Sequence, residues 1–185
     1  MPHATGGMAG VRYAMHRSGR LLSLVLTSTA SATVIGDPAG YEMFAKTLEG
    51  GTWPELHETL DTMLGGFLPK DEHQRALVRD MYALNEPKLM GQFIREFYND
   101  SDPRVDLLRE IECPTLVLVG EDDEALLESS RLMATEIAGA TLVELPGVGH
   151  MTAIEAPRET GDALIDLYTS ERVQERWRRA ESNAW

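Results

Sequence analysis

Two short loops in the second half of the chain carry side chains that could move a proton. Residues 120–123 (Gly-Glu-Asp-Asp) supply carboxylates, and residues 147–150 (Gly-Val-Gly-His) end in a histidine. Each loop follows an apolar stretch of strand length, and parallel strands end at a common edge of their sheet, where ligands gather. A carboxylate that meets the histidine there would orient the imidazole and stabilise its protonated form, as a general base requires. The spacing therefore predicts an acid–base pair at the carboxyl edge of a sheet.

A third stretch of chemical interest lies at residues 2–7, which read Pro-His-Ala-Thr-Gly-Gly. A glycine pair can cradle a phosphate, but no Lys-Ser or Lys-Thr pair follows, so phosphate binding is not expected. His3 would either line a nearby pocket or remain in solvent. Because His, Cys, Asp and Glu show no metal-ligand spacing on any single element, neither a metal site nor a cofactor is expected.

Three apolar runs have the length of strands, at residues 21–27, 115–119 and 141–145. Continuous apolar runs of this length are typical of strands buried on both faces, as in parallel sheets. Patterns with helical spacing lie between and after them, over residues 8–17, 125–137 and 157–168. The alternation predicts an α/β fold, with a parallel sheet of about three strands and flanking helices.

The stretch 37–105 has a different character, because it contains no convincing strand. Its periodic segments, separated by Gly-Gly, Leu-Pro and Glu-Pro breaks, predict helices over 53–64, 70–84 and 87–98. We interpret 37–105 as a helical cap or lid inserted into a core made of residues 1–36 and 106–170. Residues 171–185 mix arginines with glutamates and are expected to form a polar C-terminal tail, helical but frayed.

Charge and composition narrow the classes of partner and compartment. The 185 residues carry a formal net charge of −13, which repels nucleic acid and anionic lipid, so neither nucleic acid nor a membrane is an expected partner. The single cysteine, Cys113, cannot form an internal disulfide. No segment approaches the ~20 apolar residues of a membrane span, and residues 1–10 lack the pattern of a signal peptide. By default these features predict a cytoplasmic protein.

Taken together, these segments resemble the α/β-hydrolase fold family. In that family a nucleophile sits in a strand-to-helix turn written Gly-x-Ser-x-Gly-Gly, followed by a helix and a strand ending in Leu-Val-Leu. Here two glycines follow Ala4 at the family's offsets, and Leu-Val-Leu recurs at 24–26. Residues 114–123 (PTLVLVGEDD) resemble the family's acid strand. Residues 146–150 (PGVGH), with Glu-Ala-Pro at 155–157, resemble its histidine loop.

The resemblance implies a role for each of these positions. His150 would be the general base, Asp123 the acid that holds it, with Asp122 as the alternate, and residue 4 the nucleophile position, which is substituted by Ala4. The backbone N–H of Thr5 would be one donor of the oxyanion hole. The family's chemistry implies hydrolysis of an ester, a lactone or a similar carbonyl compound. The expected substrate or ligand is therefore a small carbonyl compound with an apolar portion.

The chain also departs from the family's pattern. A methyl group cannot attack a carbonyl, so Ala4 closes the acyl-enzyme route. Pro2 replaces the first glycine of the turn and restricts the backbone there. The family's earlier strands and its second oxyanion donor have no counterpart, which predicts a truncated or mis-started relative that is impaired or inactive as a hydrolase. The strand at 21–27 would then present an open apolar edge that favours self-association.

Two other functions are left open by these residues. His150 and Asp123 could act as a general base on a substrate proton or on water without any nucleophile, as in lyase-, cyclase- or dioxygenase-like relatives of the fold. A base alone typically contributes ~10²–10⁴-fold to a rate. The other alternative is a non-catalytic remnant that binds an apolar ligand or a partner.

Overall fold

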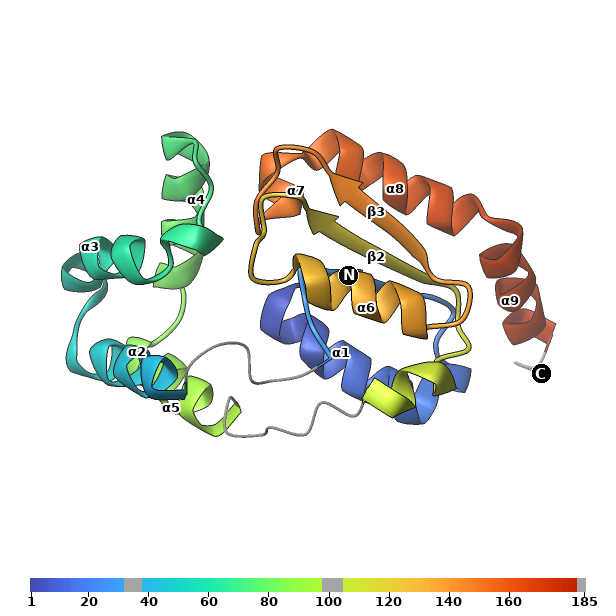
Figure 1. Cartoon of the computed structure of the whole chain (residues 1–185), viewed down its shortest axis with the longest axis horizontal. Helices are drawn as coiled ribbons and strands as arrows, with labels where there is room; N and C mark the ends of the chain where they lie inside the picture. The colour runs from blue at the N-terminus through green and yellow to red at the C-terminus, as the bar shows by residue number, and fades with distance from the viewer. Residues whose placement is uncertain (32–37, 98–104, 183–185) are drawn as a thin grey trace. The chain divides into compact units, whose positions relative to one another are not determined.

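The computed structural model describes residues 1–31, 38–97 and 105–182, which belong to two compact units. The first unit combines the two ends of the chain, Met1–Ser31 and Arg104–Trp185, and the second is Ala32–Pro103. The sheet lies in the first unit, whereas the described residues of the second are helices and their connections (Figure 1).

The sheet has three parallel strands in the order β1-β2-β3, and these span Leu24–Thr27, Thr115–Gly120 and Thr141–Leu145. Leu24 pairs with Thr115, and Leu116 with Thr141, so the carboxyl ends of the three strands lie at one edge. All six residues of β2 are buried, as its continuous apolar run predicts for a central parallel strand. The prediction of an α/β fold built on a parallel sheet is confirmed.

Helices cover both faces of the sheet (Figure 1). The first layer contains α1, the 3-10 turn η3 and α6, which span Ala4–Arg17, Val105–Glu110 and Leu127–Glu136. The second contains α7, α8 and α9, which span Thr152–Glu155, Pro157–Thr169 and Glu171–Ser182. Because side chains alternate along a strand, Leu26 and Val117 pack into the first layer, and Val25 and Leu118 into the second.

Two boundaries in this unit differ from those expected by three residues or more. The first helix begins at Ala4 instead of residue 8, because the glycine pair is part of the helix and does not precede it. β1 begins at Leu24 instead of residue 21, because the chain first makes a 3-10 turn, η1 (Ser18–Arg20). The N–H of Leu21 donates to the carbonyl of Ser18 (3.1 Å), which holds this turn closed.

The C-terminal helix α9 is attached to the first unit in spite of its polar sequence. Val173 is buried, and the guanidinium of Arg176 donates to the carbonyl oxygens of Leu21 (2.6 Å) and Ser18 (2.7 Å). These carbonyls belong to the turn after α1, so one side chain attaches α9 to that turn. The tail is helical over Glu171–Ser182, as expected, whereas its fraying stays a prediction.

The described residues of the second unit form helices, one 3-10 turn and the connections between them. Its elements are α2 (Pro38–Gly50), α3 (Trp53–Met63), the 3-10 turn η2 (Gly65–Phe67), α4 (Glu72–Ala83) and α5 (Pro87–Phe97). α2 and α5 approach closely at Gly91, where a Cβ would lie 2.6 Å from the carbonyl oxygen of Ala45. Arg95 on α5 forms ion pairs with Glu42 (2.8 Å) and Glu49 (2.6 Å) on α2. The function of this unit as a cap stays a prediction.

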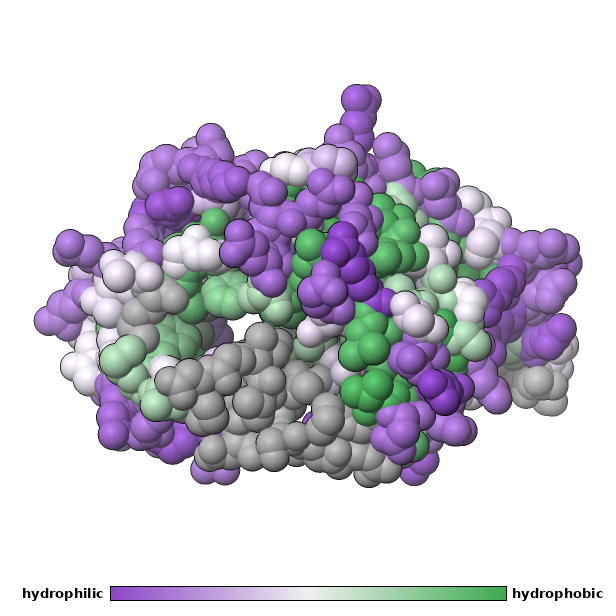
Figure 2. All heavy atoms as spheres, in the orientation of Figure 1, coloured by the Kyte–Doolittle hydropathy of each residue, from purple (hydrophilic) through white to green (hydrophobic). Residues whose placement is uncertain are grey.

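Hydrophilic residues dominate the surface seen in Figure 2, most clearly over α9. Within residues 1–31, 38–97 and 105–182, no helix has both the length and the apolarity that crossing a membrane requires.

Candidate catalytic site

The carboxylate of Asp123 is held in the turn that leaves β2. Its backbone N–H donates to the carbonyl of Gly120 (3.1 Å), and its own carbonyl accepts from the N–H groups of Leu126 and Leu127 (3.1 and 2.9 Å). These bonds lead the chain from the strand into α6 and leave the Asp123 residue only 1% exposed. A buried carboxylate is costly unless it is paired or hydrogen-bonded, so this side chain requires a partner.

His150, in the loop after β3, is that partner. Its Nδ1 lies 2.9 Å from Oδ2 of Asp123, and the residue is 6% exposed. Because an ionised carboxylate only accepts hydrogen bonds, we assign the proton to Nδ1, which places the basic lone pair on Nε2. This is the tautomer that a general base needs. Asp122, the alternate acid, is exposed, and its neighbour Asp123 makes the bond to the imidazole.

The acid and base loops also meet through their backbones. The N–H of Asp122 donates to the carbonyl of Val148 (2.9 Å). Gly120, the last residue of β2, allows this approach, because a Cβ there would lie 2.1 Å from the carbonyl oxygen of Val148 and 2.3 Å from that of Gly149. A residue without a side chain at position 120 is therefore a condition for the contact between the two loops.

The amino-terminal segment reaches the same edge of the sheet. The N–H of Thr27, at the carboxyl end of β1, donates to the carbonyl of Pro2 (3.2 Å), and His3 forms a parallel bridge with Thr27. Ala4 then turns the chain into α1 with a φ of +47°, in the left-handed region that alanine rarely adopts. Such conformations cost roughly 1–3 kcal/mol and concentrate at functional sites. The backbone therefore makes the sharp strand-to-helix turn expected around residue 4.

Thr29 holds this turn, although its sequence context does not single it out. Its hydroxyl donates to the carbonyl of Ala4 (2.6 Å), and the residue is fully buried. Its side chain occupies the space that a Cβ on Gly7 would need, because that Cβ would lie 2.4 Å from Thr29 Oγ1. The hydroxyl of Ser130 in turn donates to the Thr29 carbonyl (3.4 Å), which connects the turn to α6.

His3 connects the turn with the histidine loop. Its Nε2 lies 2.9 Å from the carbonyl oxygen of His150, and the two ring centroids are 4.6 Å apart. Burial lowers the pKa of His3, and the charge of His150 lowers it further, whereas the bond to the His150 carbonyl and the charge of Asp123 act in the opposite direction. The ring is therefore mostly neutral near pH 7. Of the two alternatives for His3, the structure favours the one in which it lines the site.

The lowered pKa of His3 predicts a loss of folding stability as the pH falls below 6.5, its ordinary pKa. Below that pH the unfolded chain binds a proton on His3 before the folded chain does, so protonation favours unfolding until the pH passes the folded-state pKa. The contribution to stability is fully present above pH 6.5. Between that pH and the folded-state pKa it decreases by at most about 1.4 kcal/mol per pH unit. Urea unfolding at about pH 7.5 and about pH 5.5 measures this effect. Between the two pH values, the free energy of unfolding should decrease less for His3→Asn than for the parent. Equal losses would contradict the prediction.

Thr5 is the first residue after the left-handed position. It lies in the first turn of α1, where the helix dipole favours negative charge. A backbone N–H at this place could stabilise an oxyanion. Its assignment as an oxyanion-hole donor stays a prediction.

A comparison with known protein families shows the family to which this chain belongs. The sequence model described as "Alpha/beta hydrolase family" matches residues 3–163, a stretch that includes the turn at Ala4, all three strands and both loops. The chain belongs to the alpha/beta hydrolase family. Membership of the family establishes the fold, whereas an activity depends on the residues of the site.

This alpha/beta hydrolase resembles curated and structurally characterised proteins at modest identity. It is 26% identical over 171 residues to Lipase 3 of Moraxella sp. (strain TA144), which covers 86% of this chain and 52% of the lipase. An enol-lactonase from Burkholderia xenovorans LB400 superimposes with a TM-score of 0.76 at 25% identity, over 91% of this chain and 64% of the lactonase. A hydrolase from Pseudomonas aeruginosa PA01 gives 0.71 at 29% identity, over 91% and 63%. The chain thus spans about half to two thirds of the length of these relatives.

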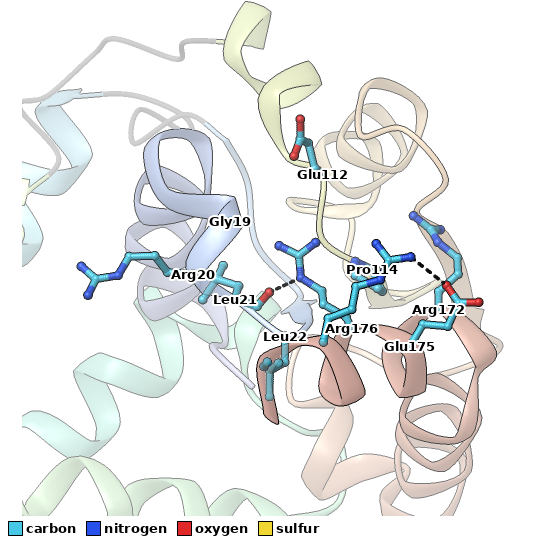
Figure 3. A pocket seen from close by; sticks show the side chains of 11 residues that line it. Gly19, Arg20, Leu21, Leu22, Glu112, Pro114, Arg172, Glu175 and Arg176 are labelled. Carbon is cyan, nitrogen blue, oxygen red and sulfur yellow. Dashed lines mark hydrogen bonds and ion pairs between the residues drawn. The ribbon is translucent and has the colours of Figure 1, made fainter. Parts of the chain in front are cut away.

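Two cavities of this alpha/beta hydrolase lie at the amino end of its strands, away from the histidine loop. The larger one, of about 430 Å3, lies between the turn after α1 and the arginine-rich face of α9, and Figure 3 shows Arg176 extending toward the Leu21 carbonyl. The other, of about 170 Å3, lies between α8 and the starts of β2 and β3. The lining of both cavities excludes Ala4, Asp123 and His150. Among the described residues, no group of three or more His, Cys, Asp or Glu is placed to hold a metal ion.

Proposed function

We propose that this alpha/beta hydrolase cleaves a small carbonyl ester or lactone with an apolar portion, and that it uses His150 as a general base without forming an acyl-enzyme. The observation that carries the proposal is the buried 2.9 Å contact between His150 Nδ1 and Asp123 Oδ2. It lies beside the left-handed turn at Ala4, to which His3 connects it. Relatives named as lipases and as an enol-lactonase support a carbonyl substrate.

In this reaction Nε2 of His150 removes a proton from water while the water oxygen forms a bond to the carbonyl carbon. The electron pair of the C=O bond moves to its oxygen, and the N–H of Thr5 would stabilise the resulting oxyanion. When the tetrahedral intermediate collapses, the C–O bond to the leaving group breaks, and the alkoxide takes the proton back from the imidazolium. Asp123 stabilises the imidazolium in between. Since Ala4 provides no nucleophile, the rate is expected to be low for the family.

A second candidate keeps the same pair but changes the reaction. His150 would remove a proton from the substrate, as in lyase-, cyclase- or dioxygenase-like relatives of the fold, and Ala4 favours this option because the turn carries no nucleophilic side chain. In both candidates the helical unit between β1 and β2 would act as the cap that selects the substrate. Binding of an apolar ligand without turnover is the outcome if neither reaction is found.

Hydrolysis of p-nitrophenyl butyrate by the parent, His150→Gln and Asp123→Asn tests the proposal. The parent should exceed the buffer rate, and both variants should lose about 10²-fold or more of that excess. Glutamine retains an N–H that can donate to Asp123, so the first variant avoids leaving a buried carboxylate without a partner. His73→Gln, at an exposed position of α4, is the matched control and should be unchanged.

A fluorophosphonate probe completes this test, because it reports a covalent nucleophile directly. The parent should not be labelled. Activity that survives His150→Gln, or a parent that hydrolyses no faster than buffer, would contradict base-catalysed hydrolysis at this site.

A further inference from the structure

Glu155 contacts the histidine loop at two points, one on each side of His150. Its Oε2 accepts from the N–H of Gly149 (3.1 Å), and its Oε1 accepts from the N–H of Met151 (2.9 Å). A single half-buried carboxylate thus binds the two peptide N–H groups that flank the histidine. Hydrogen bonds to an ionised acceptor are shorter and stronger than neutral ones, so this is a firm attachment of the loop.

The position of Glu155 is fixed by the short helix that carries it. It is the last residue of α7, and its own N–H donates to the carbonyl of Met151 (2.9 Å). The first residue of that helix, Thr152, accepts from the Thr160 hydroxyl of α8 through its carbonyl (3.1 Å). Gly149 leaves room for the carboxylate, because a Cβ there would lie only 3.1 Å from Glu155 Oε1.

Other contacts restrain the same loop from different directions. His3 donates to the carbonyl of His150, and the N–H of Asp122 donates to the carbonyl of Val148. Both of these bonds use carbonyl groups, whereas Glu155 accepts from the N–H groups of the residues on either side of the histidine. A small shift of this backbone would move Nδ1 away from Asp123, and displacements of about 1 Å in an active site can cost about 10²-fold in rate.

We propose that Glu155 is a positioning residue for the base: its carboxylate sets the backbone on both sides of His150, so that the imidazole keeps its Nδ1–H on Asp123. The catalytic consequence rests on the function proposed above, whereas the positioning itself does not. Glutamine cannot replace the carboxylate, because it has a single acceptor oxygen and would direct its NH2 group against one of the two N–H donors.

Imidazole 15N and 1H NMR of the full chain tests the positioning without any substrate. The parent should show a hydrogen-bonded His150 Nδ1–H resonance and a single tautomer. Glu155→Gln should lose or broaden that resonance and populate both tautomers, and Glu155→Asp, which is one methylene shorter, should give an intermediate result. Glu159→Gln, at an exposed position of α8, is the matched control and should resemble the parent. A parent-like Nδ1–H signal in both Glu155 variants would overturn the proposal.

Kinetics then separate this proposal from the proposed function. When Glu155→Gln is introduced into a parent or variant protein that hydrolyses p-nitrophenyl butyrate, it should lower kcat by about 10- to 100-fold while KM changes little. Loss of the NMR signal in a protein without activity would support positioning and contradict the hydrolase function. Unchanged kcat and an unchanged NMR signal in an active protein would support the hydrolase function and contradict the positioning. Circular dichroism ensures that folded proteins are compared, and Glu155→Asp serves if Glu155→Gln does not fold.

Discussion

Replacing Ala4 with serine is expected to give a protein that reacts covalently with a fluorophosphonate, which the parent should not do. The substitution adds one hydroxyl to a backbone that is already in the left-handed conformation, with a φ of +47°. The new Oγ would sit between the first turn of α1 and the loop that carries His150, whose Nε2 could remove its proton. Ester hydrolysis is expected to rise by about 10²–10⁴-fold over the parent. Mass spectrometry of the labelled protein and a p-nitrophenyl ester assay measure the two effects.

A matched control is available on the same helix. Ala9 is exposed on α1, so Ala9→Ser introduces the same group outside the turn and should be neither labelled nor activated. Ala4→Ser combined with His150→Gln should lose most of the gain, because the serine then has no base. A folded Ala4→Ser protein that the probe fails to label would show that residue 4 is not placed as a nucleophile.

The largest loss of stability is expected for Gly120→Ala. A Cβ at this position would lie 2.1 Å from the Val148 carbonyl oxygen and 2.3 Å from that of Gly149, and both are backbone atoms that cannot rotate away. The histidine loop would have to move off β2, which breaks packing and separates His150 from Asp123. Overpacking of this kind typically costs about 1–3 kcal/mol. Urea unfolding should report this loss, and the His150 Nδ1–H resonance should disappear with it.

The control for this substitution is Gly161→Ala. Gly161 lies inside α8, and a Cβ there would meet nothing within 4 Å. Because alanine is the better residue in a helix interior, this change should stabilise the protein by about 0.5–1 kcal/mol. If both variants have the same free energy of unfolding, the close approach of the two loops at Gly120 is wrong.

The parts of the fold that local patterns encode could be predicted from the sequence. β2 was recognisable because all of its side chains are buried, so its apolar run has no polar interruption. The meeting of Asp123 with His150 follows from two parallel strands that end at one edge, and the structure places their side chains 2.9 Å apart. The roles of these residues in catalysis stay predictions that the experiments above address.

What could not be predicted depends on contacts between distant segments. Thr29 is one of several serines and threonines after β1, and only the fold brings its hydroxyl to Ala4, 25 positions earlier. Arg176 lies among other arginines, and its bond to Ser18 spans 158 positions. The predicted start of the first helix is wrong for a related reason: the glycine pair indicates a turn, whereas Gly7 is a helical residue that makes room for Thr29.

The division of the first unit between two distant stretches of sequence affects how the protein is made. Residues up to Ser31 are synthesised before Ala32–Pro103, whereas β2, β3 and helices α6 to α9 are synthesised after it. β1 can therefore pair with β2 only after β2 has been synthesised. Strand pairings between segments so far apart in the sequence form slowly. During that interval the apolar residues of α1 and β1 lack the partners that η3 and β2 supply in the folded protein, which favours binding of the nascent chain by chaperones until the sheet is complete.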